Sequence, residues 1–326
     1  MNRRDFNSTI GAAGGLFAAS GLSAGITEDR TPAETYDYFK RRNPHERLSL
    51  AYRHVKIGLE KPFSILHISD THLCDVYAHE PENKRSFAKL RTTTFGGYME
   101  EALRDSLAWA KNNVDAVLHT GDLIDFQTEA NYDLVKKYFG ESPNLFGCAG
   151  NHEYQRRLEG EAIRNTTEYN DLSAAELRKV FPFDLKLQST VVGGVNFVSI
   201  EQTYGFVTKE QVERFHAEVK KGLPIVLCMH VPFMTDEIWR ANRKFWAGCG
   251  RKYRSVDLDA ARGDYKRQLE DPVTSSFIAY LRKEPLLKAI CAGHLHITVD
   301  DQFSPTAREF LVAGNFLFHG QEILFT

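Results

Sequence analysis

The sequence contains few cysteines, and they are not spaced as in zinc ribbons or disulfide-rich scaffolds. There are five in 326 residues, and no two form a C-x-x-C pair. Three of them, Cys148, Cys228 and Cys291, lie within apolar runs, where buried free thiols are expected. The other two, Cys74 and Cys249, fall in expected loops, and a disulfide between them stays open at this stage.

The chain also lacks a strong excess of charge of either sign. Its formal net charge is −2, so no global positive field attracts nucleic acid or an anionic membrane, and no stable nucleic-acid partner is expected. A local basic patch is compatible with this total. Hydrophobic residues make up 42% of the chain, which excludes a disordered or fibrous protein. No repeat, low-complexity tract or linker divides the chain after Pro62.

The first residues lack the pattern of a folded element. After Arg3 and Arg4, followed by Asp and Phe, a run rich in Gly, Ala and Ser carries no charge as far as Ile26. A basic start, a mildly apolar middle and small residues near Ala24 predict a signal peptide over residues 1–27. The paired arginines resemble the twin-arginine export signal. The run contains too much Gly and Ser for a membrane span, and none is expected in the mature chain.

This signal predicts that the twin-arginine export machinery is a partner of the chain. It places the folded protein in the periplasm or outside the cell, or at the membrane if the signal stays uncleaved. The alternative is a frayed or helical N-terminus of a cytosolic protein, which a charge-free Gly/Ala stretch disfavours. Residues 28–61 are charged and are interpreted as a lead-in segment with one edge strand near Val55–Leu59.

After Pro62, short apolar runs alternate with segments of helical periodicity, which is typical of an α/β protein. The expected strands are Ser64–Ser69, Ala116–Thr120, Asn144–Ala149, Val195–Glu201, Ile225–Met229, Leu287–Ala292, Glu309–Ala313 and Glu322–Phe325. The expected helices are Gly97–Asn113, Ala130–Phe139, Ala174–Val180, Lys209–Lys221 and Val273–Lys283. Ser173 and Thr208 occupy positions where helix N-caps are expected.

Polar residues directly follow five of the apolar runs, at the carboxyl end of each expected strand. The five blocks are Asp70-Thr71-His72, Gly121-Asp122-Leu123-Ile124-Asp125, Gly150-Asn151-His152-Glu153, His230, and Gly293-His294-Leu295-His296. Such strand ends share one edge of an α/β sheet, so these groups are expected to converge on one cleft. Carboxylate and imidazole groups suit divalent Mn, Fe or Zn. A single Asp or His after a strand is usually a turn residue, but five blocks in order favour a metal site.

The ordered series of blocks resembles the calcineurin-like metallophosphoesterases, from about Pro62 to the C-terminus. The resemblance implies a four-layer α-β-β-α sandwich, with residues 62–326 as the catalytic domain. It also implies a centre of two divalent metal ions that hydrolyses phosphate esters. By the same resemblance, Asp70, His72 and His296 would hold one metal, Asn151, His230 and His294 the other, and Asp122 would bridge them.

The implied reaction needs a general acid as well as the metals. Two cations that share a water make it a hydroxide near neutral pH, and this hydroxide attacks phosphorus in line. The departing alkoxide then needs a proton. His152 is the candidate donor, because it is the one motif histidine that the family does not use as a ligand, and Asp125 is placed to orient it as in related phosphatases. A hydrogen-bonding role without proton transfer is the alternative for His152, and Glu153 is expected to be structural.

Three further residues limit which side chains can be ligands and which kind of metal site is expected. His67 and His119 lie inside expected strands and are interpreted as core histidines rather than ligands. Purple acid phosphatases carry a ligand tyrosine three residues after the bridging aspartate, where this chain has Asp125. A charge-transfer iron(III) site is therefore not expected.

A basic and aromatic stretch after His230 is the candidate substrate-binding region. Between Trp239 and Arg254 it contains six basic residues and four aromatic ones. Arginine and lysine would bind phosphate, and aromatic rings would stack on a base or pack on a sugar or lipid head group. The specific candidates are Arg240, Arg243, Lys244 and Trp246. The expected substrate is a small phosphorylated molecule. The alternative for the stretch itself is a solvated loop whose aromatic side chains pack onto the body of the protein.

The motifs do not separate a phosphodiesterase from a phosphomonoesterase, a nuclease or a nucleotidase. A non-catalytic binding protein on the same fold is the alternative from another class. The complete set of ligand residues argues against it, because loss of chemistry would be expected to remove at least one ligand.

Overall fold

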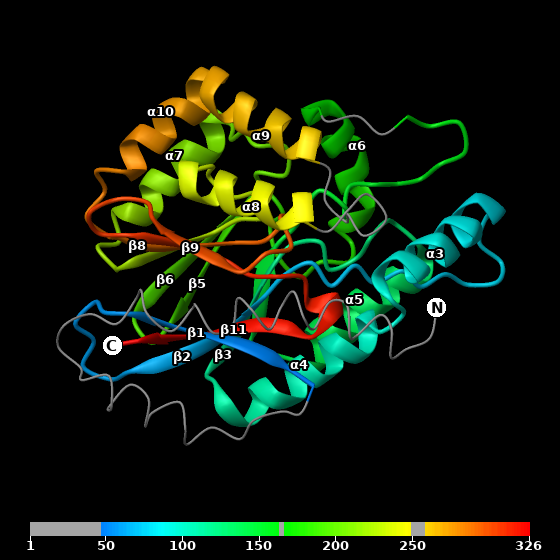
Figure 1. The fold of residues 1–326 in the computed structure, drawn as a ribbon, viewed down its shortest axis with the longest axis horizontal. Coiled ribbons are helices and arrows are strands. Elements are labelled where there is room, and N and C mark those ends of the chain that lie inside the picture. Colours follow the sequence, from blue (N-terminus) through cyan, green and yellow to red (C-terminus); the bar gives the residue numbers. More distant parts are fainter. Residues whose placement is uncertain (1–46, 163–165, 249–257) are drawn as a thin grey trace.

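The computed structural model describes residues 47–162, 166–248 and 258–326 (Figure 1). The expected signal peptide, most of the lead-in segment, Cys249 and Arg251–Arg254 lie outside the described residues. Within the described ranges, no helix is both long and apolar enough to cross a membrane.

Two mixed sheets form the centre of the molecule. The first has five strands in the order β1-β11-β2-β3-β4, and the second has six in the order β5-β6-β7-β8-β10-β9. The strands of the first sheet are β1 (Ser49–Val55), β11 (His319–Phe325), β2 (Phe63–Ile68), β3 (Ala116–Thr120) and β4 (Leu145–Cys148). Those of the second are β5 (Leu187–Val192), β6 (Val195–Ile200), β7 (Ile225–Cys228), β8 (Leu287–Ala292), β10 (Arg308–Leu311) and β9 (Val299–Gln302). Neighbouring strands are parallel within β2-β3-β4 and within β6-β7-β8-β10.

Helices cover the outer face of each sheet, so the chain forms four layers (Figure 1). Those on the side of the first sheet are α3 (Glu82–Phe95), α4 (Met99–Asn113) and α5 (Glu129–Glu141). Those on the side of the second are α7 (Lys209–Val219), α8 (Asp236–Gly248), α9 (Leu258–Glu270) and α10 (Pro272–Leu281). The remaining helical segments are α6 (Thr167–Leu177) and the short 3-10 helix η2 (Asn315–Leu317). The expected α-β-β-α sandwich is confirmed.

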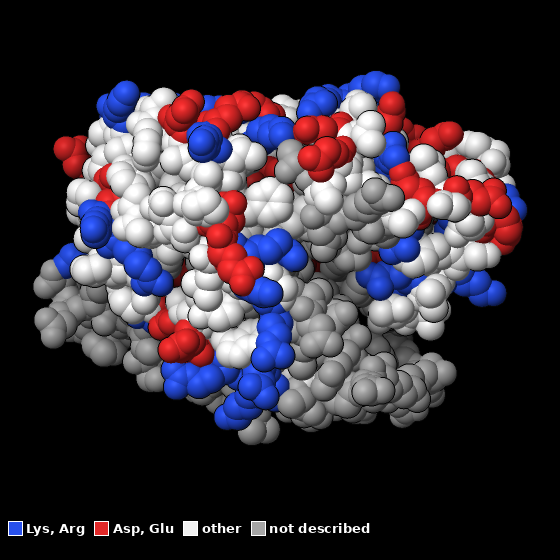
Figure 2. Space-filling model, turned by 90° about the horizontal axis from the view of Figure 1, so that it is seen from above, with Lys and Arg blue, Asp and Glu red and all other residues white. Residues whose placement is uncertain are grey.

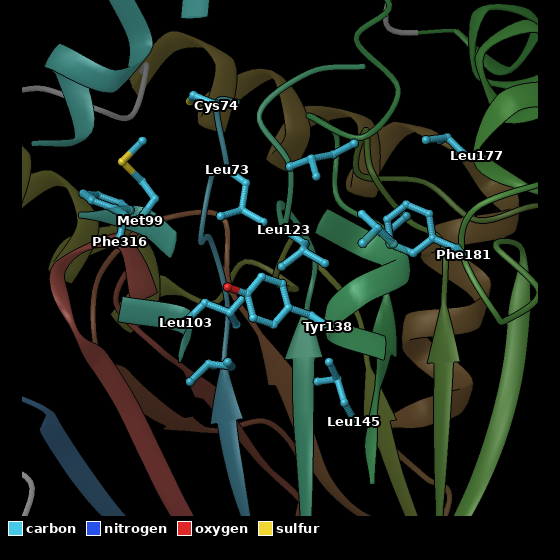
Figure 3. Close-up of a cluster of buried hydrophobic side chains, with 14 of the residues drawn as sticks. Leu73, Cys74, Met99, Leu103, Leu123, Tyr138, Leu145, Leu177, Phe181 and Phe316 are labelled. Carbon is cyan, nitrogen blue, oxygen red and sulfur yellow. The ribbon is translucent and has the colours of Figure 1, made fainter. Parts of the chain in front are cut away.

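Alternating side chains along the strands build the layers. Ile65 of β2 and Leu118 of β3 face the second sheet, where they share a core with Val226 of β7. Their neighbours Leu66 and Val117 point the other way, into the helix-facing core of the first sheet. Figure 3 shows that core, in which side chains of α4 and α5 converge. Both faces of these strands are buried, which explains their near-continuous apolar sequence.

Two expected boundaries are wrong. The edge strand is Ser49–Val55 rather than Val55–Leu59, because it pairs with β11 only as far as Val55 opposite Phe325, near the C-terminus. Helix α6 begins at Thr167, and the side chain of Thr166 caps it by accepting the N–H of Tyr169. Ser173 therefore lies inside the helix rather than at its N-cap.

The other N-cap is confirmed. The Thr208 side chain accepts the N–H of Gln211, and the Gln211 side chain accepts the N–H of Thr208, which completes a capping box. This reciprocal pair fixes the start of α7.

The interior cysteines and strand histidines behave as expected. Cys148, Cys228 and Cys291 are buried free thiols, and Cys74 is buried too, with its thiol donating to the His72 carbonyl oxygen. The His67 ring contacts Thr120 and Gln321, and the His119 ring contacts Thr71. Burial lowers the pKa of His67 to about 3 and that of His119 to about 4, so both rings are neutral near pH 7.

Candidate metal centre

The polar residues at the five strand ends meet between the two sheets. The chain leaving β2 runs beside the chain leaving β3: the Asp70 N–H donates to the Gly121 carbonyl oxygen at 2.9 Å, and the His72 N–H to that of Asp122 at 2.8 Å. Two groups of three side chains place their ligand atoms within 4.8 Å of one another. The groups are Asp70, His72 and His296, and Asp122, His230 and His294. The first group is the one predicted for one metal. The second joins two residues predicted for the other metal, His230 and His294, with Asp122, the predicted bridge.

Asp122 lies between the two groups. Its Oδ2 atom is 3.7 Å from Nε2 of His72 in the first group and 3.2 Å from Nε2 of His230 in the second. Within the first group, Nε2 of His296 is 3.2 Å from Oδ1 of Asp70 and 3.2 Å from Nε2 of His72. One carboxylate therefore faces both clusters, as a bridging ligand must.

Two of the predicted ligand histidines are oriented through their second ring nitrogens. Nδ1 of His72 is 2.9 Å from a carboxylate oxygen of Asp125, and Nδ1 of His230 is 2.7 Å from the carbonyl oxygen of Thr120. Since an acceptor at Nδ1 holds the proton there, the Nε2 lone pair of a neutral ring points into the centre. Burial lowers the pKa of His72 to about 4. Burial also disfavours protonated His230, but Asp122 outweighs this and raises its pKa to about 10, so a proton would compete with a cation for that lone pair.

One polar atom of the predicted ligand set fits a cation. The side-chain oxygen of Asn151 is buried and has no hydrogen-bond partner among the described residues. Buried polar atoms normally have one, because leaving them unpaired costs free energy. The oxygen and imidazole nitrogen donors suit Mn, Fe or Zn, so the residues present fit a divalent metal.

The backbone at the site is in an unusual conformation. Left-handed φ angles between 54° and 66° occur at five of the predicted ligands: Asp70, His72, Asp122, His294 and His296. Residues other than glycine rarely adopt this region, and strain of this kind gathers at functional sites. Two glycines allow close packing there. A Cβ atom on Gly150 would lie 2.3 Å from Oδ1 of Asp122, and one on Gly293 would lie 2.5 Å from Oδ2 of Asp70.

Glu153 holds together two loops that carry predicted site residues. Its fully buried carboxylate accepts backbone N–H groups from Gly150 at 2.7 Å and from Leu123 at 2.6 Å. It also accepts those of Asp122 and Ile124. The residue ties the loop after β4 to the loop after β3, which is the structural role that the sequence suggests.

His152 and Asp125 lie side by side as predicted. Nδ1 of His152 is 2.9 Å from both Oδ1 and the backbone carbonyl oxygen of Asp125. The His152 backbone N–H donates to Oδ1 of Asp122 at 2.8 Å. Burial opposes the charged ring, but Asp122 and Asp125 outweigh it and raise the pKa of His152 to about 9. With this pKa the ring is protonated near pH 7. Its side chain is 18% exposed and therefore within reach of solvent.

A basic residue outside the predicted ligands and the predicted acid pair completes this arrangement. Arg91 of α3 donates to both carboxylate oxygens of Asp125, at 2.7 and 2.8 Å. His72, Asp125 and His152 also place ligand atoms within 4.8 Å of one another. A cation there would face the Arg91 guanidinium, so this trio suits a hydrogen-bonded network better than a third metal.

The substrate candidates on α8 divide into exposed and buried side chains. Arg240, Arg243 and Lys244 are exposed, and Arg240 also contacts the carbonyl oxygen of Asp236. Trp246 is only 5% exposed, and its indole N–H donates to the Leu295 carbonyl oxygen at 3.0 Å. The indole therefore supports the loop that carries His296 and leaves little surface for stacking on a substrate. Figure 2 shows both basic and acidic groups on the face seen there, with a run of basic side chains near its lower centre.

The family follows from a comparison of sequences. Residues 63–298 match the calcineurin-like phosphoesterases. The chain belongs to this family. It is therefore a metal-dependent phosphoric ester hydrolase of a family that uses a dinuclear centre, and its clustered histidines and aspartates are suited to such a centre.

Solved structures with similar folds have low sequence identity to this phosphoesterase. A dimetal phosphatase from Danio rerio is 14% identical, with a TM-score of 0.44, over 78% of this chain and 88% of that one. The phosphopantetheinyl hydrolase of Mycobacterium tuberculosis is 12% identical, with a TM-score of 0.38, over 78% of this chain and 91% of that one. A 5'-nucleotidase from Candida albicans is 14% identical, with a TM-score of 0.37, over 84% of this chain but 47% of its own length. No curated protein sequence matches the chain.

Proposed function

We propose that the phosphoesterase centre uses the seven residues at the strand ends as metal ligands. Asp70, His72 and His296 hold one divalent ion, Asn151, His230 and His294 hold the other, and Asp122 bridges them. The observation that carries this assignment is the position of Asp122, whose Oδ2 atom faces Nε2 of both His72 and His230. When bound, two cations supply an activated water nucleophile and neutralise charge on the phosphate.

His152 acts as the general acid in this proposal. Because Asp125 engages its Nδ1 atom, Nε2 is the ring nitrogen that can reach the departing oxygen of the ester. Asp125 orients the ring. The backbone N–H of His152 also donates to Asp122, which places the acid next to the bridging ligand.

The substrate in this proposal is a small phosphorylated molecule, and the metals are Mn, Fe or Zn. Helix α8 begins six residues after His230 and presents Arg240, Arg243 and Lys244 to solvent, where their charges can bind phosphate oxygens. The formal net charge of −2 argues against a long nucleic acid.

The proposal also covers export. The paired Arg3 and Arg4 and the uncharged run that follows support a twin-arginine signal over residues 1–27, with residues 62–326 as the exported catalytic domain. Cell fractionation tests this. Replacing both arginines by lysine should keep the protein in the cytoplasm, whereas an unchanged distribution would contradict the twin-arginine route.

A substrate panel on metal-loaded protein, with the metals quantified, tests the proposed chemistry. Turnover of bis(p-nitrophenyl) phosphate above that of p-nitrophenyl phosphate would identify a diesterase, and the reverse a monoesterase. Nucleotides, sugar phosphates and glycerophosphodiesters extend the panel. Absence of turnover on every ester at full metal loading would contradict the proposed function.

A further inference from the structure

Helix α3 reaches the metal centre through an arginine. Nε of Arg91 lies 2.7 Å from Oδ2 of Asp125, and Nη2 lies 2.8 Å from Oδ1. Two parallel bonds of this kind fix both the position and the plane of the carboxylate. Asp125 is fully buried and the Arg91 side chain is 20% exposed, so the pair is largely shielded from solvent.

The same helix carries an aromatic ring one turn later. The Arg91 guanidinium carbon lies 4.6 Å from the ring centroid of Phe95. Phe95 in turn stacks on the imidazole of His72, with 4.3 Å between centroids and 14° between planes. His72 is therefore held at two places, at Nδ1 by Asp125 and on one ring face by Phe95.

Asp125 connects these contacts to the proposed acid. Its Oδ1 atom is 2.9 Å from Nδ1 of His72 and 2.9 Å from Nδ1 of His152, which also lies 2.9 Å from the Asp125 carbonyl oxygen. A rotation of this carboxylate would disturb a metal ligand and the acid at once. Arg91 makes a bond to each oxygen and opposes such a rotation.

We infer that Arg91 and Phe95 form a positioning clamp that fixes Asp125 and thereby orients both His72 and His152. The inference rests on the proposed function, since it takes His72 as a metal ligand and His152 as the acid. Arg91 acts through Asp125 in this account. If Arg91 instead bound the substrate phosphate directly, its effect would not depend on Asp125, and this difference is measurable.

A double-mutant cycle makes that distinction. We expect Arg91→Gln to lower kcat about 10- to 100-fold, with KM changed less than about threefold, because an orienting contact outside the ligand set is lost. In the background of Asp125→Asn, Arg91→Gln should have almost no further effect, because its partner carboxylate is already gone. If the fold decrease in kcat of the double variant equals the product of the decreases of the two single variants, the clamp is overturned.

A binding measurement gives a readout that does not depend on turnover. Titration of metal-free protein with Mn²⁺ should show an apparent Kd weaker by about 10- to 100-fold in Arg91→Gln. A smaller change is expected for Arg91→Lys, which keeps the charge but cannot form the two-pronged contact. Arg85→Gln on the same helix is the matched control, since Arg85 is paired with Glu82 instead, and it should bind Mn²⁺ as the wild type does.

The outcomes separate the clamp from the proposed function. Wild-type protein that binds no metal and cleaves no ester would contradict the proposed function. If the wild type binds Mn²⁺ and Arg91→Gln binds it equally well, the clamp is overturned but the proposed function is not. If Arg91→Gln does not fold, Arg91→Lys and Phe95→Leu take its place, and an unchanged Mn²⁺ affinity in both would overturn the inference.

Discussion

The backbone N–H of His294 donates hydrogen bonds to both carboxylate oxygens of Asp70, at 3.2 and 2.9 Å. Asp70 follows β2 in the first sheet, and His294 follows β8 in the second. The contact therefore joins the two sheets at the metal centre. It depends on Gly293, where a side chain would meet Ser69 as well as Asp70.

A methyl group at this glycine should damage the site. In Gly293→Ala the new Cβ would lie 1.9 Å from the Ser69 hydroxyl oxygen and 2.5 Å from Oδ2 of Asp70, so Asp70 must move. We expect bound metal and turnover to fall at least about tenfold, because disturbed support of a ligand costs about that much. Gly140→Ala is the control, since no atom lies within 4 Å of its added Cβ. Full metal content in Gly293→Ala would contradict the close packing described here.

The proposed bridge Asp122 and the proposed ligand His294 should both be essential. Asp122→Asn removes the charge that faces both metal groups, and His294→Ala removes a donor from one of them. We expect both variants to lose detectable hydrolysis and to bind about one ion fewer per chain, because the remaining donors hold the cations more weakly. Kinetic assays and elemental analysis of the same samples measure this. Wild-type activity in either variant would rule out the dinuclear assignment.

The proposed acid should affect turnover but not metal content. His152→Ala should retain both ions and lower kcat by about 10²- to 10⁴-fold for an alkyl phosphate ester. The loss should be smaller for a p-nitrophenyl ester, whose leaving group departs without a proton. His79→Ala is the matched control, because His79 is exposed and pairs with Glu129 away from the centre. Loss of metal in His152→Ala would show that this residue is a ligand.

The buried carboxylate of Glu153 should matter for stability. Glu153→Ala leaves four backbone N–H groups without their acceptor, and we expect the free energy of unfolding of metal-free protein to fall by more than about 3 kcal/mol. Denaturant titration measures this, with exposed Glu213→Ala of α7 as the control, expected to change it by less than about 0.5 kcal/mol. An equal effect of both substitutions would refute the role of Glu153.

The five polar blocks came from local patterns, and the resemblance to the calcineurin-like metallophosphoesterases implied which of their residues would be ligands. Each ligand block follows a short apolar strand, and parallel strands bring their carboxyl ends to one edge. The structure gathers six of these residues into two metal-sized groups and leaves the side-chain oxygen of Asn151 buried without a partner. The apolar runs also predicted most of the buried strands of both sheets.

Elements with weak apolar patterns were missed. Helix α3 buries only Ala88 and Phe95, so its sequence lacks an apolar stripe, and its contacts with His72 and Asp125 are long-range. Strand β5 is mostly half-exposed and was missed for the same reason. Helix α8 does bury Ile238, Asn242 and Trp246 at helical spacing, but its dense charge suggested a loop. In such segments, tertiary contacts rather than the local sequence pattern determine the secondary structure and which residues reach the site.

The metal stoichiometry of active protein is the most direct measurement of the central claim. Chelator-treated chain is titrated with Mn²⁺ or Zn²⁺ while bound metal and phosphate ester hydrolysis are recorded on the same sample. We predict no hydrolysis without metal and full activity only as binding approaches about two ions per chain. Full activity in metal-free protein, or saturation of activity at a single ion, would contradict a two-metal phosphoesterase.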